Sequence, residues 1–238
     1  MLGLFITGVR PNSGRIFVTA GLSAVMQSLG YSTCVYKPVV TGALERKGCI
    51  LAPDLVYIKN TDKNLTTCCS YLFKSRNLPY YAAAEENAVI EKEVIFQDYY
   101  SVIDDYDCLV VSGSDGLSIP YGQSLYEENI IQMLNMPLLL VASPVQSSFE
   151  DILKTIEQAK SRNINLRGVI LYDCPFNTDD ANLRSLPKLI ENHSGAKVLG
   201  VVPHIPSISR IKPEDILSYI LAGVDIEAVF DVPIAKLR

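Results

Sequence analysis

A glycine-framed turn near the start of the chain carries residue types that could hold a phosphate group. Gly8 and Gly14 bracket this turn, which follows an apolar run over residues 2–6 and precedes apolar residues at helical spacing over 16–29. Glycines adopt backbone conformations that a side chain blocks, so successive N–H groups and a helix N-terminus can point at one anion. The full motif ends Gly-Lys-Ser/Thr, in which the lysine contacts the outer phosphates and the hydroxyl contacts Mg²⁺. This turn ends Gly14-Arg15-Ile16, so the glycine frame is present while two of its chemical groups are changed.

The elements around the turn predict the fold that must position it. A strand, a helix of about fourteen residues and a second strand over 33–36 make a βαβ unit, which implies parallel strands and a right-handed crossover. Further strands are expected at 108–111, 137–141, 166–172 and 198–202, and helices at 94–105, 126–134, 149–160, 181–191 and 213–223. The less regular stretch between them predicts a helix start at Pro53-Asp54, an edge strand over 71–73 and a short helix over 82–86. We therefore predict one α/β domain over residues 1–238, a doubly wound, mostly parallel sheet with helices on both faces.

The same architecture predicts where ligands would bind. In doubly wound sheets, ligands bind beyond the carboxyl ends of the strands. The loops expected at those ends are 8–15, 37–42, 112–116, 143–147, 172–175 and 203–206. Any chemistry should therefore be found in these loops.

Composition excludes several classes of protein. The 238 residues are 48% hydrophobic and carry a formal net charge of −5, which gives no reason to expect nucleic acid or an anionic membrane as a partner. The six cysteines show no CxxC pair and no histidines at ligand spacing, so we expect reduced thiols rather than disulfides or a zinc site. Because no basic region and apolar stretch precede a cleavage site, we expect a cytoplasmic protein.

Several longer motifs occur in an order that resembles one family. They are FITG followed by five residues and Gly14, YKPVVTG over 36–42, Asp54, LVVSGSDGLSIP over 109–120, MPLLLV over 136–141, RGVIL over 167–171 and LGVVPHIP over 199–206. With these motifs the chain resembles the dethiobiotin synthetases over nearly its whole length. Those are P-loop enzymes that use ATP, Mg²⁺ and CO₂ to close the ureido ring of dethiobiotin on diaminopelargonic acid.

The resemblance implies roles for particular residues. Lys37 and Thr41 would lie at the substrate amines and the nascent carbamate, and Arg15 would act with them as the third catalytic residue. Asp54 would be a Mg²⁺ ligand, with Asp115 available as a second. The residues implied in nucleotide binding are Gly8, Asn12, Ser13, Gly14, Arg15 and Ile16 in the loop, and Tyr172, Asp173, Pro203 and His204 near the base. The resemblance also implies a homodimer whose substrate site is completed across a two-fold interface, and a substrate like diaminopelargonic acid.

The departures from the family pattern concentrate on the nucleotide side. Arg15 replaces the P-loop lysine, Ile16 replaces a metal-binding hydroxyl, and Ser112 replaces the second acidic metal ligand. A family lysine is Val145 here, and the asparagine that reads adenine is Tyr172, or Asp173 if the register differs by one residue. Losing one preorganised electrostatic contact commonly costs about 3 kcal/mol of transition-state stabilisation. Two hypotheses stay open: a ligase with a degraded nucleotide site, or a non-catalytic paralogue that serves as a binding or interaction module.

Overall fold

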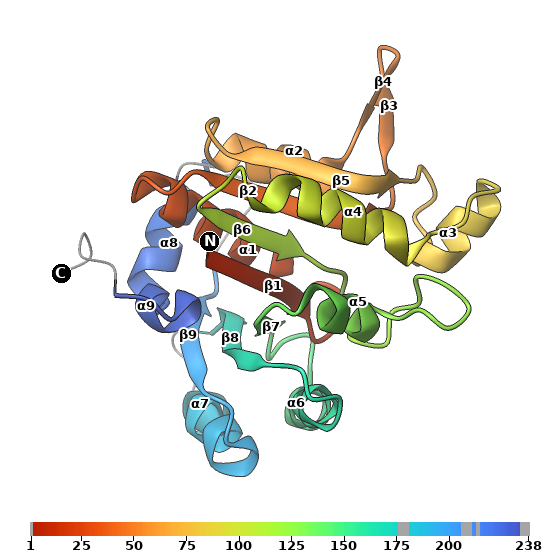
Figure 1. Cartoon of the computed structure of the whole chain (residues 1–238). Helices are drawn as coiled ribbons and strands as arrows, with labels where there is room; N and C mark the ends of the chain where they lie inside the picture. The colour runs from red at the N-terminus through yellow and green to blue at the C-terminus, as the bar shows by residue number, and fades with distance from the viewer. Residues whose placement is uncertain (1, 176–180, 206–210, 213–214, 234–238) are drawn as a thin grey trace.

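A seven-stranded parallel sheet forms the centre of the molecule (Figure 1). The computed structural model describes residues 2–175, 181–205, 211–212 and 215–233. The strand order is β5-β2-β6-β1-β7-β8-β9, and every neighbouring pair is parallel. The strands are β1 (Leu2–Gly8), β2 (Thr33–Val40), β5 (Thr66–Leu72), β6 (Cys108–Ser112), β7 (Leu138–Ala142), β8 (Leu166–Cys174) and β9 (Val198–Pro203). The predicted α/β class with its parallel sheet is confirmed.

Helices cover both faces of this sheet and enclose two apolar cores. One core contains α1 (Arg15–Ser28), α2 (Pro53–Thr61), α8 (Ile216–Gly223) and α9 (Ile226–Phe230). The other contains α3 (Pro79–Glu85), α4 (Lys92–Ile103), α5 (Glu127–Leu134), α6 (Phe149–Ser161) and α7 (Ala181–Ser194). Successive residues of β1 face opposite cores, as Phe5 and Ile6 do, because side chains alternate along a strand.

Strand β2 is longer than the sequence predicted. We expected it to stop at Lys37-Pro38, and that expectation was wrong, because the strand continues to Val40. Pairing of β2 with β6 ends at Tyr36, whereas pairing with the edge strand β5 continues to Val40. Pro38 therefore costs no ladder hydrogen bond on the β6 side. The extension moves Lys37 inside the strand.

Several other elements differ from the sequence-based expectation. Strand β5 lies at the predicted edge but begins at Thr66, and α3 begins at Pro79 rather than residue 82. The short hairpin of β3 (Leu44–Arg46) and β4 (Cys49–Leu51) was not expected and projects from the molecule (Figure 1). Its turn residues Lys47 and Gly48 both have positive φ, at 51° and 76°, as in a type I′ turn. The expected start of the last helix at Pro213 lies outside the described residues, and α8 begins at Ile216.

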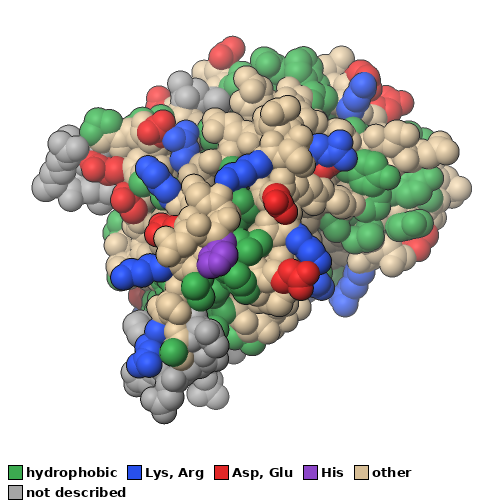
Figure 2. Space-filling model, turned by 90° about the horizontal axis from the view of Figure 1, so that it is seen from below, with side chains coloured by type: hydrophobic (Ala, Val, Ile, Leu, Met, Phe, Trp, Pro, Cys, Tyr) green, Lys and Arg blue, Asp and Glu red, His purple; other side chains and the backbone are tan. Residues whose placement is uncertain are grey.

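Exposed apolar side chains gather at one end of the molecule. Figure 2 shows them over the end where α3 lies in Figure 1. Leu78, Tyr80, Tyr81 and Tyr126 are each between 38% and 54% exposed. In the part of the chain that the structure describes, no helix has the length and apolarity needed to cross a membrane.

Candidate functional site

The predicted phosphate loop forms the connection between β1 and α1. Strand β1 ends at Gly8 and α1 begins at Arg15, so the strand–turn–helix context is as predicted. Gly14 is the helix N-cap with φ 86°, and Asn12 has φ 63°. A left-handed conformation at a helix N-cap suits glycine because it has no Cβ. Ile16, at the position of the family hydroxyl, packs against the apolar core.

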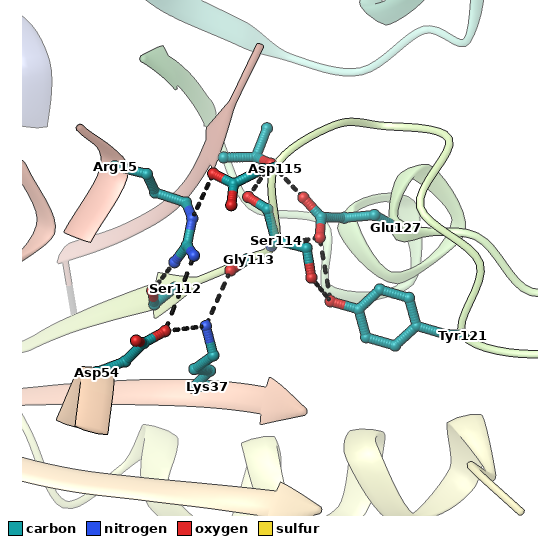
Figure 3. Close-up of polar contacts among 10 residues, drawn as sticks. Arg15, Lys37, Asp54, Ser112, Gly113, Ser114, Asp115, Tyr121 and Glu127 are labelled. Atoms are coloured by element: carbon teal, nitrogen blue, oxygen red, sulfur yellow. Dashed lines mark hydrogen bonds and ion pairs between the residues drawn. The ribbon is translucent and has the colours of Figure 1, made fainter. Parts of the chain in front are cut away.

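The guanidinium of Arg15 lies at the centre of the candidate site (Figure 3). Only 5% of the residue is exposed. Nη1 donates a hydrogen bond to Ser112 Oγ at 2.8 Å, and Nε lies 3.3 Å from Asp115 Oδ1. Nη2 lies 3.9 Å from Asp54 Oδ2. Arg15 thus contacts Asp54, Asp115 and Ser112, the three positions considered above for metal ligation.

Lys37 brings a second cation to Asp54. Its Nζ lies 2.8 Å from Asp54 Oδ2 and 3.5 Å from the carbonyl oxygen of Gly113, and Lys37 is 5% exposed. Burial and the nearby Arg15 charge lower the pKa of Lys37, against the attraction of Asp54. Burial alone would raise the pKa of Asp54, but the charges of Lys37 and Arg15 outweigh it and lower that pKa. Asp54 is therefore an ionised carboxylate already paired with two cations.

These residues do not fit a Mg²⁺ ion. Magnesium requires near-octahedral oxygen ligands, and Ile16 offers no oxygen. The Ser112 hydroxyl already accepts a hydrogen bond from Arg15, and Asp54 is paired with Lys37. Among the described residues, no group of three or more His, Cys, Asp or Glu could hold a metal ion. The place that would need a cation is filled by the Arg15 guanidinium.

Asp115 lies against the phosphate loop itself. A Cβ built on Gly8 would lie 2.6 Å from Asp115 Oδ1 and would also overlap Ser13 Oγ. Ser13 is fully buried, and its hydroxyl has no hydrogen-bond partner among the described residues. The carboxylate of Asp115 therefore contacts both ends of the loop, Gly8 at its start and Arg15 at its end.

The residues expected near a nucleotide base come together at the ends of β8 and β9. Asp173 Oδ1 lies 2.6 Å from His204 Nδ1, and the backbone N–H of His204 donates to the Cys174 carbonyl at 2.7 Å. Pro203 is the last residue of β9. This group lies apart from Lys37 in the sheet order, because β8 and β9 are at the other side of β1 from β2.

Tyr172 differs from the rest of this group because it reaches the loop. A Cβ at Gly14 would overlap the Tyr172 ring, and the ring centroids of Tyr172 and Phe17 are 5.3 Å apart. Burial raises the pKa of Tyr172 to about 12. Gly14 thus allows the close approach of an aromatic side chain.

Thr41 is placed differently from the catalytic residues predicted with it. It follows β2 directly and is half-buried, whereas Lys37 and Arg15 lie in the ion-pair cluster with Asp54. The cluster thus contains two of the three predicted catalytic residues.

The structure adds a buried carboxylate that the sequence did not single out. Glu127 is fully buried and accepts hydrogen bonds from the Thr7 hydroxyl, the Ser114 N–H and the Tyr121 hydroxyl (Figure 3). Burial raises the pKa of Glu127, against these hydrogen bonds. The missed signal was its spacing, because Glu127 precedes the buried residues Ile130, Ile131 and Leu134 by three, four and seven positions, which puts it on the apolar face of α5.

The parallel sheet and the glycine loop after β1 define a P-loop-type α/β protein. The sequence profile of the AAA domain family matches residues 2–212. The fold is similar to that of the MinC:MinD cell division protein complex of Aquifex aeolicus, with a TM-score of 0.60, 13% identity and coverage of 93% of this chain and 88% of that one. A ParA family ATPase from Chlorobium tepidum gives a TM-score of 0.59 at 11% identity, covering 93% of this chain and 91% of that one.

Curated relatives with similar sequences show to which family within this P-loop class the chain belongs. The ATP-dependent dethiobiotin synthetase BioD of Anoxybacillus flavithermus is 30% identical over 215 residues, which is 88% of this chain and 95% of the relative. That of Bacillus licheniformis is 26% identical over 237 residues, 97% of each chain. The chain belongs to the dethiobiotin synthetase family, as its motifs predicted.

Proposed function

We propose that this chain is a non-catalytic member of the dethiobiotin synthetase family. In this proposal it keeps the fold and the substrate-side residues Lys37 and Thr41 but does not carry out ATP- and Mg²⁺-dependent ring closure. The observation that carries the proposal is the Arg15 guanidinium, buried between Ser112 at 2.8 Å, Asp115 at 3.3 Å and Asp54 at 3.9 Å. A cation of the chain occupies the place where the family chemistry needs a metal.

The size of the expected loss supports the proposal. Phosphoryl transfer depends mainly on positioning and charge stabilisation, and each lost contact commonly costs about 3 kcal/mol, or a hundredfold to a thousandfold in rate. Arg15, Ile16 and Ser112 all depart from the family pattern. Even if these losses add poorly, little of the acceleration remains.

The nucleotide side supports the same proposal. The Tyr172 ring packs on Gly14 at the N-terminus of α1, and the Asp115 carboxylate lies against Gly8. Both contacts occupy surface that an ATP molecule would need at the loop. The role that remains is binding of a small molecule of the diaminopelargonic acid type near Lys37 and Thr41.

A homodimer is part of this proposal. Leu78, Tyr80, Tyr81 and Tyr126 expose apolar surface at the α3 end of the molecule (Figure 2), and exposed apolar patches mark interaction surfaces. We expect a second copy of the chain to cover it. Light scattering after size exclusion should give twice 26.2 kDa, and a monomer at micromolar concentration would contradict this part.

A working ligase is the second candidate, favoured by the intact residues Lys37, Thr41 and Asp54 and by 30% identity to the Anoxybacillus flavithermus enzyme. Two measurements separate the candidates: isothermal titration with ATP, with and without Mg²⁺ and diaminopelargonic acid, and an assay for dethiobiotin formation. The native protein should show neither Mg²⁺-enhanced ATP binding nor product. The triple variant Arg15→Lys, Ile16→Thr, Ser112→Glu should gain ATP binding that requires Mg²⁺. Product formed by the native protein would overturn the proposal.

A further inference from the structure

The loop that carries Asp115 is anchored to the end of β1. The Gly113 N–H donates to the Ile6 carbonyl at 2.9 Å, and the Gly8 N–H donates to the Ser114 carbonyl at 3.2 Å. The Thr7 hydroxyl oxygen, which also contacts Glu127, lies 2.9 Å from the same carbonyl oxygen. These bonds hold the 113–115 segment beside the start of the phosphate loop.

A second set of contacts holds the same segment from the α5 side. The Ser114 N–H donates to the buried Glu127, and Ser114 Oγ lies 3.0 Å from the Tyr121 hydroxyl. Tyr121, which is 1% exposed, also donates to Glu127 at 3.0 Å. Because both sides of Ser114 are fixed, the next residue, Asp115, has little freedom to leave the loop.

Arg15 and Asp115 reproduce the charges that a metal and a phosphate would bring. The Arg15 cation faces Asp54 and Ser112, and the Asp115 anion faces Arg15 and Gly8. The buried hydroxyl of Ser13 lies beside Gly8, next to the Asp115 carboxylate. It has no hydrogen-bond partner among the described residues. The Asp115 carboxylate and an unpaired Ser13 hydroxyl thus lie together at the phosphate loop.

We propose that the Asp115 carboxylate acts as an internal anion that occupies the phosphate loop, with Arg15 as its counterion, and so prevents phosphate from solution from binding there. The inference rests on the proposed function, in which the loop no longer serves Mg²⁺-ATP. Removing the carboxylate frees the Nε of Arg15 and the space beside Gly8, and it removes the repulsion toward an incoming anion. The opened loop binds inorganic phosphate or pyrophosphate without a divalent metal, because the guanidinium supplies the positive charge.

The test is a titration of pyrophosphate into the full-length protein in EDTA. Asp115→Asn keeps the shape of the side chain, and Asp115→Ala vacates its space. The matched control is Asp105→Asn, which makes the same charge change at an exposed residue before β6, at the opposite end of that strand from the loop. We expect both Asp115 variants to bind pyrophosphate at least tenfold more tightly than the native protein and the control.

A second substitution links the gain to the loop. Adding Arg15→Met to Asp115→Asn should return the affinity to the native level. The inference is overturned if the native protein binds pyrophosphate as tightly as the Asp115 variants, or if folded Asp115 variants bind no more tightly than the Asp105 control. Dethiobiotin formation by the native protein would instead overturn the proposed function, so the two failures are distinguishable.

Discussion

The Nζ of Lys37 lies 2.8 Å from Oδ2 of Asp54, so a residue expected to meet substrate is paired with a residue expected to bind metal. The pair forms because the first turn of α2, which carries Asp54, packs beside β2, which carries Lys37. Lys37 is buried while the Asp54 side chain is 28% exposed. The contact therefore stabilises a cation on an interior strand that is largely shielded from water.

Removing the carboxylate of Asp54 should destabilise the fold. A fully buried pair that loses one partner costs about 3–5 kcal/mol. Because Asp54 is partly exposed, we expect Asp54→Ala to lower the free energy of unfolding by about 2 kcal/mol. Urea unfolding measures it, with Glu45→Ala as the matched control. Glu45 pairs with Lys74 at 2.7 Å, but both side chains are more than half exposed, so the loss of Glu45 should cost much less than the loss of Asp54. Equal costs would contradict the structural role of the Lys37 pair.

Glu127 should be more costly to truncate than to replace by its amide. Glu127→Ala removes the buried acceptor that the Thr7 hydroxyl, the Ser114 N–H and the Tyr121 hydroxyl share. Buried unsatisfied donors cost roughly 1–3 kcal/mol each, so we expect a loss of about 3 kcal/mol or more. Glu127→Gln retains one acceptor oxygen and should lose less than half as much. Chemical denaturation compares the two variants, and equal losses would show that the network does not depend on the acceptor.

The sequence predicted the elements of the site better than its contacts. The glycine turn is a local feature, because strand, turn and helix follow within a few residues, so Gly8 and Gly14 were found where expected. The pairing of Lys37 with Asp54 was not predictable in this way. It depends on the packing of α2 beside β2, two elements that the β3–β4 hairpin separates along the chain. No local sequence pattern contains that tertiary contact.

Short and exposed elements were also beyond sequence reasoning. The strands β3 and β4 have three residues each, and all of them except Leu51 are exposed. Without a buried face there is no apolar alternation to detect. For Glu127 the sequence held two conflicting signals, because its helical spacing indicated burial while its charge indicated exposure. The hydrogen bonds from Thr7, Ser114 and Tyr121 decide in favour of burial, and all three donors lie outside α5.

Glu127 should also make stability depend on pH. Burial raises its pKa in the folded state, while the unfolded chain keeps the ordinary glutamate pKa of about 4.3. The folded state therefore binds more protons, so this contribution is fully present below about pH 4 and is lost as pH rises through the raised pKa. In Glu127→Gln this loss should disappear. Urea midpoints from pH 4 upward, compared between the native protein and the variant, should diverge as pH rises, and parallel profiles would contradict the raised pKa.

Gly14 should tolerate a side chain only when Tyr172 is truncated. Gly14→Ala meets two costs, a positive φ of 86° and overlap with the Tyr172 ring. Gly48→Ala isolates the first cost, because Gly48 has φ 76° and nothing within 4 Å of an added Cβ; we expect about 1–2 kcal/mol there. Gly14→Ala should cost more, since overlap in a packed region adds about 1–3 kcal/mol. In the Tyr172→Ala background, its cost should fall to that of Gly48→Ala. A double-mutant cycle by denaturant unfolding measures the coupling between Gly14→Ala and Tyr172→Ala. Additive changes in the free energy of unfolding would contradict the close packing of the Tyr172 ring on Gly14.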